Sequence, residues 1–569
     1  MIKNYLIAFC VLNAVLDNKG CDGDQPVLNT HIGKFYGELL EFESGIKVDA
    51  FYGVPYAKKP IGELRFEKPE DAEYVKERSA TTRPKACLQA KLFLPVEASE
   101  DCLYVNVFRP HEKIPSGNPA LFFIHGGGYQ AGSAQEHSED YVAEYYAGSA
   151  ITVVVPQYRL NFYGFATTKT SNLPGNLGLH DLNLALDFVH KNAESLNIDV
   201  TKITVAGYSA GSAAASVLSL SPLSHDKFAQ VIQFSGSTLA EWAFNNRGYE
   251  HTKRVIKILN CDQGDVKKCL KEKSVDDIDK AMVKAHMFEG EINHFDYGST
   301  LDDDFFKNDP ESLVKSAKPK VTLGSLNENE GLLFTIYFPP TPQAFKHALT
   351  KEQKQNFGIE DFTNFVQKTI VMEKLLGEEH KAASDEIIDF YLKSTTHEEH
   401  TRTFYLDMHA KVLGDVMFVV PQLRELKLKQ EAGWPVYNIL STYSDYLERT
   451  MSHIEVSKTS HATEYRFLFG IGFNPHDNSL TETDEKYRKL LVDSVVNFIK
   501  TGSPKSTKNQ NFTQTSKDRP LVYTDLNTKA TVKDSYFGKE FEFWSNFYNK
   551  YQFDVIRGEP KKTLKHVEL

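Results

Sequence analysis

Short runs of β-branched and aromatic residues recur along the chain and predict buried strands. They lie at 120–124, 151–155, 203–205, 231–234 and 435–440. The runs are apolar without alternation, as is typical of parallel strands buried on both faces. Apolar residues at helical spacing separate them. Strands that alternate with helices predict an α/β fold with a mostly parallel central sheet flanked by helices.

Two charged stretches with helical patterns, 239–314 and 333–419, interrupt this alternation. We interpret them as helical insertions around the central sheet. The chain has 569 residues and shows no internal repeat or low-complexity linker. Large α/β enzymes can form one unit of this length. We therefore expect a single domain over residues 17–565.

The first 16 residues have the pattern of a secretory signal peptide. Lys3 supplies a positive end, and residues 5–16 are mostly apolar. A membrane span needs about 20 apolar residues, and no later stretch is long and apolar enough. A signal anchor and a buried strand are the alternatives.

The last four residues resemble the His-x-Glu-Leu variant of the endoplasmic-reticulum retention signal. These residues are His566, Val567, Glu568 and Leu569. Together with a signal peptide they predict residence in the endoplasmic-reticulum lumen and a retention receptor as partner. Secretion is the alternative location, and a solvated tail without function is the alternative interpretation.

Six cysteines fit a secretory route, which permits disulfides. Cys87 and Cys102 are close enough in sequence to close a small loop, and so are Cys261 and Cys269. None of these spacings resembles a zinc site. Asn511 begins an Asn-Phe-Thr acceptor for N-glycosylation. The net charge of −11 argues against a nucleic-acid-binding protein.

A Gly-x-Ser-x-Gly motif at 207–211 places Ser209 between a predicted strand at 202–206 and a predicted helix at 212–220. Such an elbow strains a nucleophilic serine outward, and small flanking residues avoid clashes in the turn. A serine hydroxyl still needs a base, a carboxylate that orients the base, and donors for the oxyanion. The motif alone is weak evidence, because a helix that starts with small residues would look similar.

His-Gly-Gly-Gly-Tyr at 125–129 directly follows the apolar run at 120–124. Consecutive glycines let backbone amides face a bound carbonyl without obstruction by side chains. This is the oxyanion-loop pattern of esterases. We expect the N–H groups of Gly127, Gly128 and Ala210 to bind the oxyanion.

Several further motifs in the same order resemble the type-B carboxylesterases of the cholinesterase superfamily. They are Phe-Tyr-Gly-Val-Pro-Tyr-Ala at 51–57, Glu-Asp-Cys-Leu-Tyr-Val-Asn-Val at 100–107, Tyr-Arg-Leu at 158–160 and Pro-Gly-Asn-Leu-Gly-Leu-His-Asp at 174–181. The resemblance covers nearly the whole chain after the signal peptide. It implies the α/β-hydrolase fold and ester hydrolysis without a metal or organic cofactor.

The resemblance also implies the partners of Ser209. The segment 323–331 matches the one that carries the triad acid just before Gly, which gives Glu330 the role. The segment 460–464 matches the one that carries the triad histidine, here His461, with Ser460 in place of the usual Gly. Two further residues are expected beside the triad: Ser235 and Glu464.

Tyr208 stands where the family usually has Glu before the nucleophile. In cholinesterases that Glu contributes negative charge near the choline ammonium. The loop between Cys87 and Cys102 is also short and lacks the Trp that cholinesterases use to bind the cation. Both departures predict neutral small-molecule esters as substrates.

The elbow tyrosine and the C-terminal tail resemble nematode gut esterases. The leading hypothesis is a carboxylesterase of broad specificity. A selective esterase or lipase for one lipid or hormone ester is an alternative. A non-catalytic, adhesion-type member of the superfamily is a more distant one, because such members lose the nucleophile and this chain has Ser209. The sequence does not indicate the oligomeric state.

Overall fold

The computed structural model describes residues 25–89, 97–286, 292–293, 295–337, 345–393, 400–451, 455–472, 479–506 and 511–560. The predicted signal peptide at 1–16 and the tail residues His566, Val567, Glu568 and Leu569 lie outside these ranges. No helix among the described residues is long and apolar enough to cross a bilayer.

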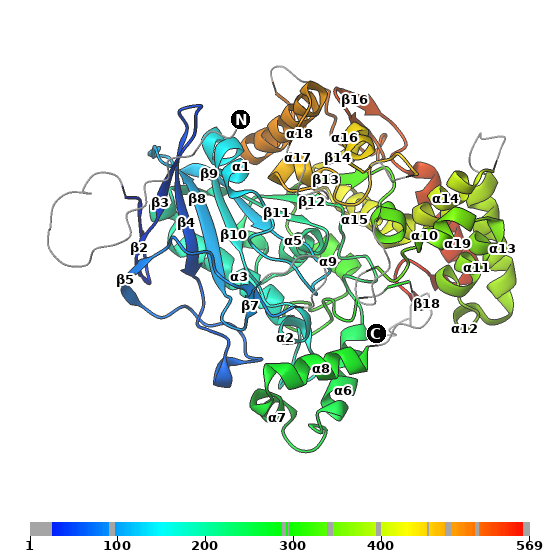
Figure 1. Ribbon diagram of the computed structural model, residues 1–569, viewed down its shortest axis with the longest axis horizontal. Helices are drawn as coiled ribbons and strands as arrows, with labels where there is room; N and C mark the ends of the chain where they lie inside the picture. The colour runs from blue at the N-terminus through cyan, green and yellow to red at the C-terminus, as the bar shows by residue number, and fades with distance from the viewer. Residues whose placement is uncertain are drawn as a thin grey trace, which may run out of the picture.

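An eleven-stranded sheet forms the centre of the molecule, in the order β16-β15-β14-β13-β12-β11-β9-β10-β8-β4-β3 (Figure 1). Neighbours from β10 through β15 pair in parallel, and the strands at both edges pair antiparallel. The bounds are β3 Glu38–Glu41, β4 Lys47–Pro55, β8 Tyr104–Pro110, β9 Asn118–Ile124, β10 Thr152–Pro156, β11 Ile198–Tyr208, β12 Gln230–Phe234, β13 Val321–Asn327, β14 Val436–Ser441, β15 Tyr523–Leu526 and β16 Ala530–Lys533. All five apolar runs predicted as strands overlap strands of this sheet, which confirms the α/β fold.

The parallel strands are apolar on both faces because both faces are covered. In β9, Phe122 belongs to the hydrophobic cluster on one face, whereas Leu121 and Phe123 belong to the cluster on the other. Helices α3 (Leu177–Lys191) and α5 (Ala210–Leu220) contribute to the first cluster, and α1 (Glu139–Tyr145) and α18 (Glu482–Thr501) to the second. This burial explains why the runs show no alternation.

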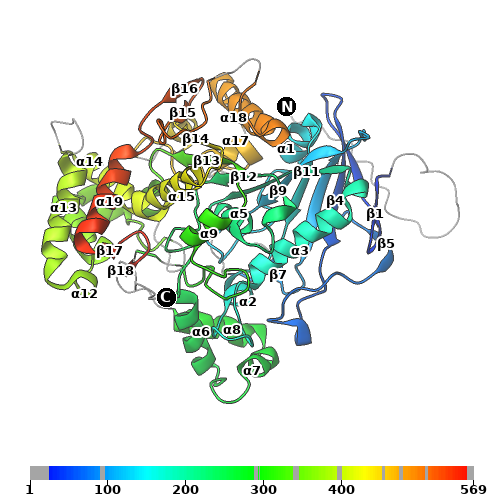
Figure 2. The ribbon, with the colours of Figure 1, turned by 180° about the vertical axis from the view of Figure 1, so that it is seen from behind.

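Helices occupy both stretches that the sequence predicts as insertions. Figure 1 shows α6, α7 and α8 at the lower end and α10 to α14 at the side, next to the C-terminal α19; Figure 2 shows the same arrangement from behind. The bounds are α6 Arg247–Ile258, α7 Val266–Glu272, α8 Val275–Ala285, α9 Pro310–Ser316, α10 Lys351–Asn356, α11 Ile359–Phe365, α12 Glu373–Leu376, α13 His380–Lys393, α14 Arg402–Gly414, α15 Val420–Glu431 and α19 Gly538–Tyr551. Three π-helical turns accompany them: η4 Leu333–Tyr337, η5 Val366–Ile370 and η7 Asp415–Val419.

The remaining elements are short. The other helices are α2 Asn161–Phe165, α4 Ala193–Leu196, α16 Asp445–Thr450 and α17 Tyr465–Phe469, with 3₁₀ turns η1 Gly62–Leu64, η2 Ala147–Ser149, η3 His225–Lys227 and η6 Gly377–Glu379. The small sheets contain β1 Val27–Thr30, β2 Gly33–Tyr36, β5 Val75–Ser79, β6 Ala86–Cys87, β7 Ala98–Ser99, β17 Phe553–Asp554 and β18 Glu559–Pro560.

The carboxyl ends of the parallel strands share one edge of the sheet. The oxyanion-loop motif follows β9, Ser209 follows β11, Ser235 follows β12 and Glu330 follows β13. Open parallel sheets bind ligands at this edge. The parallel topology therefore gathers residues that are far apart in the sequence.

Candidate active site

Ser209 lies on a tight turn between β11 and α5. Its backbone has φ 56° and ψ −119°, a conformation that is strained for any residue with a side chain. Two backbone hydrogen bonds hold it there. The Ser209 N–H donates to the Phe234 carbonyl at 2.8 Å, and the Ser209 carbonyl accepts from the Ala213 N–H at 3.0 Å. The strand-to-helix elbow predicted from the motif is thus present.

The two motif glycines are required by close backbone approach. A Cβ atom at Gly207 would lie 2.0 Å from the Gly211 carbonyl oxygen. A Cβ atom at Gly211 would lie 2.1 Å from the Ile124 carbonyl oxygen. Any side chain would therefore open the turn or push it away from β9.

Glu330 and His461 form a buried hydrogen-bonded pair. The distance between His461 Nδ1 and Glu330 Oε2 is 2.7 Å. With the Nδ1 proton directed at this carboxylate, Nε2 is left as the acceptor. Nε2 is buried and has no hydrogen-bond partner among the described residues, so the contact to Ser209 Oγ is not formed. In enzymes without substrate such contacts are often long and tighten on binding.

Three aromatic rings surround the His461 imidazole. Ring centroids of Phe418, Tyr208 and Phe334 lie 4.3, 5.0 and 5.3 Å from the centroid of the imidazole. Phe334 belongs to the aromatic stretch 332–338, whose last residue lies outside the described ranges. These contacts fix the orientation of the ring and make its surroundings apolar.

Glu330 is held by further donors on its other oxygen. The Ser235 hydroxyl donates to Glu330 Oε1 at 2.7 Å, and the Asn327 N–H donates to the same oxygen at 2.7 Å. Ser235 has φ 51°, in the left-handed region. The structure thus places the Ser235 hydroxyl beside the Glu330–His461 pair.

Glu464 approaches the pair through Asn327. The Asn327 side-chain amide donates to Glu464 Oε2 at 2.6 Å. Burial, and then the charge of Glu330, raise the pKa of the Glu464 carboxyl to about 8. Near neutral pH the Glu464 side chain is therefore uncharged.

The oxyanion loop is oriented by hydrogen bonds to its carbonyls. His125 Nδ1 lies 3.0 Å from the Gly126 carbonyl, and the Ala131 N–H donates to the Gly127 carbonyl at 3.0 Å. Burial lowers the pKa of His125 to about 4, so the ring is neutral and Nδ1–H can donate. In a trans peptide the N–H points opposite to the preceding carbonyl. Fixing these two carbonyls therefore fixes the N–H groups of Gly127 and Gly128.

Ala210 is the first residue of α5, directly after Ser209. The first N–H groups of a helix have no partner within the helix and carry the positive end of its dipole. The Ala210 N–H is thus available at the elbow for a developing negative charge.

The predicted cysteine pairs both form disulfides in the structure, Cys87 with Cys102 and Cys261 with Cys269. Asn511 is exposed, as a glycosylation acceptor must be, although its side-chain amide donates to the Ala530 carbonyl at 3.1 Å.

Asn327 and Phe418 contact the Glu330–His461 pair, and neither could be identified as a site residue from the sequence. Asn327 lies inside the motif at 323–331, but its bridge between two carboxyl groups depends on where Glu464 folds. Phe418 lies in a helical insertion, and nothing in its local sequence marks it as a neighbour of His461.

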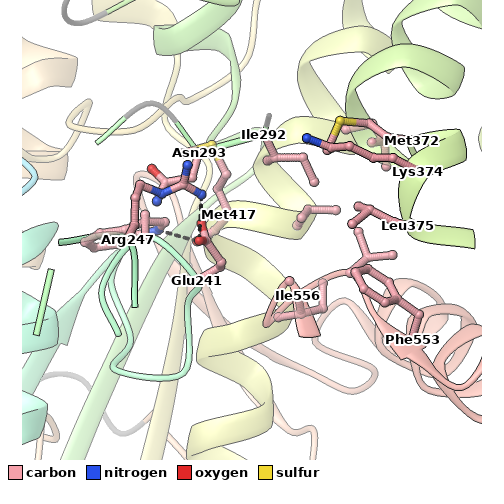
Figure 3. Close-up of a pocket in the computed structure, with 15 residues that line it drawn as sticks. Glu241, Arg247, Ile292, Asn293, Met372, Lys374, Leu375, Met417, Phe553 and Ile556 are labelled. Atoms are coloured by element: carbon pink, nitrogen blue, oxygen red, sulfur yellow. Dashed lines mark hydrogen bonds and ion pairs between the residues drawn. The ribbon is translucent and has the colours of Figure 1, made fainter. Parts of the chain in front are cut away.

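A cavity of about 160 Å³ that is not lined by Ser209, Glu330 or His461 borders η7. Figure 3 shows the Glu241–Arg247 ion pair with Asn293 on one side, and Lys374 among mostly apolar side chains on the other. Its lining includes Trp242, Leu375, Val416, Met417 and Ile556. Val416 and Met417 of the π-helical turn η7 therefore line this cavity, while Phe418 of the same turn contacts the His461 imidazole.

Along the chain, the serine follows β11, the acid follows β13 and the histidine comes after β14, which is the order of these groups in α/β-hydrolases. The molecule is an α/β-hydrolase. A sequence model of the Carboxylesterase family matches residues 24–544, and the chain belongs to this family.

Several named relatives match this chain over nearly its full length. Gut esterase 1 of Caenorhabditis briggsae is 31% identical over 556 residues, covering 95% of this chain and 96% of the relative. Gut esterase 1 of Caenorhabditis elegans is 30% identical, over 95% of this chain and 96% of the relative. Pyrethroid hydrolase Ces2a of Mus musculus is 28% identical, over 97% and 96%. These relatives confirm the resemblance to gut esterases. Together with the family match, they support carboxylesterase activity for this chain.

Proposed function

We propose that the protein hydrolyses neutral carboxylic esters through an acyl-enzyme on Ser209. The observation that carries the proposal is the buried Glu330–His461 hydrogen bond of 2.7 Å at the sheet edge where the elbow presents Ser209. A base held in one tautomer by a carboxylate is what a serine hydroxyl needs to become a nucleophile.

In the proposed reaction, His461 Nε2 takes the proton of Ser209 Oγ as this oxygen bonds to the ester carbonyl carbon. The carbonyl oxygen becomes an anion and accepts hydrogen bonds from the N–H groups of Gly127, Gly128 and Ala210. Losing one such donor typically costs about 3 kcal/mol of transition-state stabilisation. His461 then returns the proton to the leaving alkoxide as its bond to carbon breaks.

The acyl group is released by water. His461 takes a proton from the water molecule, whose oxygen attacks the acyl carbon. The second tetrahedral intermediate collapses, the bond to Ser209 Oγ breaks, and the serine recovers its proton from His461. The carboxylic acid leaves and the enzyme is restored, without a cofactor.

A preference for neutral esters is supported by the surroundings of His461. The residue before the nucleophile is the uncharged Tyr208, and Glu464 is held neutral by burial. Aromatic rings of Phe334 and Phe418 cover other sides of the imidazole. The uncharged Tyr208 and the protonated Glu464 add no negative charge that would attract a quaternary ammonium group, which supports an uncharged substrate.

We further propose that the enzyme works in the endoplasmic-reticulum lumen, where a receptor binds the tail at 566–569, and that Asn511 is glycosylated. The disulfides Cys87–Cys102 and Cys261–Cys269 support an oxidising compartment. The exposure of Asn511 supports access by the glycosylation machinery.

Substitution Ser209→Ala tests the proposed chemistry. We expect hydrolysis of p-nitrophenyl butyrate to fall by at least about 10³-fold, because the nucleophile is lost. The circular dichroism spectrum and thermal midpoint should match those of the wild type. Turnover that persists at the wild-type rate in the variant would refute the assignment of Ser209.

A further inference from the structure

One continuous helical segment packs against Glu330 and His461 and against residues that border Ser209. It comprises α14, the π-helical turn η7 and α15, residues 402–431, and we call it the buttress segment. π-helical turns within longer helices frequently occur at functional sites. The contacts of this segment indicate what it does.

The first contact is between α14 and the acid. A Cβ atom at Gly331 would lie 1.9 Å from the Ala410 carbonyl oxygen, and one at Gly414 would lie 3.3 Å from the Glu330 carbonyl carbon. Backbone therefore packs directly on backbone here, so α14 fixes the position of the Glu330 main chain.

The second contact is between η7 and the base. Phe418 packs on His461 with ring centroids 4.3 Å apart. The neighbouring Met417 carbonyl accepts a hydrogen bond of 2.7 Å from Trp242 Nε1, which anchors the π-helical turn. The same segment thus touches both members of the buried pair.

The third contact is made by Gln422 of α15, which is fully buried. Its Oε1 accepts from the Gly236 N–H at 2.7 Å, and its Nε2 donates to the Ser325 carbonyl at 3.0 Å. The Ser325 carbonyl also accepts from the Ser235 N–H at 2.9 Å. Gln422 therefore holds the peptide group after Ser235 directly. It holds the peptide group before Ser235 through the shared Ser325 carbonyl.

The residues that Gln422 holds are connected to both the acid and the nucleophile. Ser235 donates its hydroxyl to Glu330 and keeps a strained φ of 51°, which persists only where surrounding contacts enforce it. Gly236 lies against the elbow, since a Cβ atom there would be 2.1 Å from the Ser209 carbonyl oxygen. A displacement at Gly236 would therefore reach Ser209 as well as Glu330.

A buried ion pair completes the same face of α15. Glu425 and Lys429 are fully buried, 2.6 Å apart. Glu425 also accepts from the hydroxyls of Ser216 and Ser237, each at 2.5 Å. Ser216 belongs to α5 and Ser237 to the loop after Gly236. This network fixes α15 relative to α5, the helix that starts directly after Ser209.

We propose that Gln422 is a positioning residue for ester hydrolysis. It acts through Ser235 and Gly236, keeping the Ser235 hydroxyl on Glu330 and the Ser209 backbone in its elbow conformation. The inference rests on the proposed function, since it assigns Gln422 a role in the reaction of Ser209. Gln422 itself touches no reacting atom.

Substitution Gln422→Met tests this role, because methionine fills a similar volume without hydrogen-bonding to the loop. We expect kcat per folded molecule to fall about tenfold while KM changes less than about threefold, since the loss affects the transition state. The acid limb of the kcat/KM profile should move up by about 0.5 pH unit. A Glu330 carboxylate that loses the Ser235 hydroxyl stabilises the His461 imidazolium more strongly.

Leu423→Ala is the matched control. Leu423 is the next residue of α15 and packs in a separate apolar cluster with Leu326, Val419 and Tyr536. This variant should lower the thermal midpoint but leave kcat and the pH profile of the folded enzyme unchanged. A fall in kcat of the same size in Leu423→Ala would show that any damage to α15 impairs the reaction. That result would overturn the proposal of a specific role for Gln422.

A double variant supplies the decisive comparison. If part of the effect of Gln422 runs through the Ser235 hydroxyl, the loss of kcat in Gln422→Met combined with Ser235→Ala should be smaller than the product of the two single losses. Fully multiplicative losses would overturn the proposal, as would wild-type kcat and pH profile in Gln422→Met.

If Gln422→Met does not fold, Gln422→Asn replaces it, because the shorter side chain cannot reach the Gly236 N–H. The same comparison with Ser235→Ala then applies. An active wild type with an unaffected Gln422 variant refutes only this inference. Full activity in Ser209→Ala refutes the proposed function instead, and the role of Gln422 with it.

Discussion

At the scale of single residues, two buried carboxyl groups lie close together at the site and differ in their partners. Glu330 accepts hydrogen bonds from His461, Ser235 and the Asn327 backbone. Glu464 accepts one from the Asn327 side chain, and its Oε1 has no partner among the described residues. A carboxylate needs several donors to stay charged when buried. The single partner of Glu464 is consistent with the proton that its raised pKa places on this carboxyl group.

Substitution Glu464→Gln should alter how stability depends on pH. The folded protein holds the Glu464 proton up to a pKa of about 8, whereas an unfolded carboxyl loses it near its ordinary value of 4.5. The folded state then binds more protons between these values, so wild-type stability falls as pH rises through this window. Glutamine keeps the hydrogen bond from Asn327 without this cost.

The quantity to compare is the free energy of unfolding of Glu464→Gln minus that of the wild type. We expect this difference to increase by about 3 kcal/mol between pH 5 and pH 8. Urea titrations at several pH values measure it. A constant difference between the two proteins across this range would contradict a protonated Glu464.

Tyr208 controls the charge beside the base, and Tyr208→Glu should therefore change substrate preference. A carboxylate at this position attracts a quaternary ammonium group. We expect the kcat/KM ratio of butyrylcholine to its uncharged analogue 3,3-dimethylbutyl butyrate to rise about tenfold. The control Tyr208→Phe, which keeps the ring on His461, should leave the ratio unchanged. A ratio that does not respond to the carboxylate would show that Tyr208 has no part in selecting neutral esters.

At the scale of elements, the β11–α5 elbow could be predicted from sequence because its requirements are local. An apolar strand, a Gly-Tyr-Ser-Ala-Gly turn and a small-residue helix are adjacent in the chain. The partners of Ser209 could not be predicted this way. His461 is separated from β14 by α16 and a connecting segment, and only the family resemblance distinguished it from the other histidines. The bridge through Asn327 and the contact of Gln422 depend on tertiary packing, which no local pattern records.

Substitution Gly207→Ala tests the geometry of the elbow. The new methyl group would lie 2.0 Å from the Gly211 carbonyl oxygen, so the turn must open. Small displacements of a nucleophile can cost about 100-fold in rate, and we expect at least this loss in kcat/KM. Gly358→Ala is the control, since a Cβ atom at Gly358 would meet nothing within 4 Å. Wild-type kcat/KM in Gly207→Ala would contradict the close packing described for the elbow.

At the scale of the whole molecule, the sheet brings the site together and the insertions complete it. The apolar runs were sufficient to predict five of the strands that pair in parallel, β9, β10, β11, β12 and β14. The strands that were not predicted are the antiparallel edge strands β3, β4, β8 and β16, together with β15 and the acid-bearing β13. The disulfides join residues that are near in sequence, which is why spacing alone suggested them.

The proposed location is also a property of the whole chain. Deleting residues 566–569 should release active enzyme from animal cells into the medium, because a retention receptor would no longer bind it. Esterase activity in medium and lysate measures the distribution. A full-length protein that is already secreted, or a truncated one that stays in the cell, would contradict retention.

Covalent trapping of the Ser209 hydroxyl tests the proposed acyl-enzyme. The protein would be treated with a fluorophosphonate ester, digested and analysed by tandem mass spectrometry. We expect one phosphonyl group per inactivated molecule, on the Ser209 hydroxyl, and none in Ser209→Ala. Complete inactivation with the modification on another residue, or with Ser209 unmodified, would contradict it.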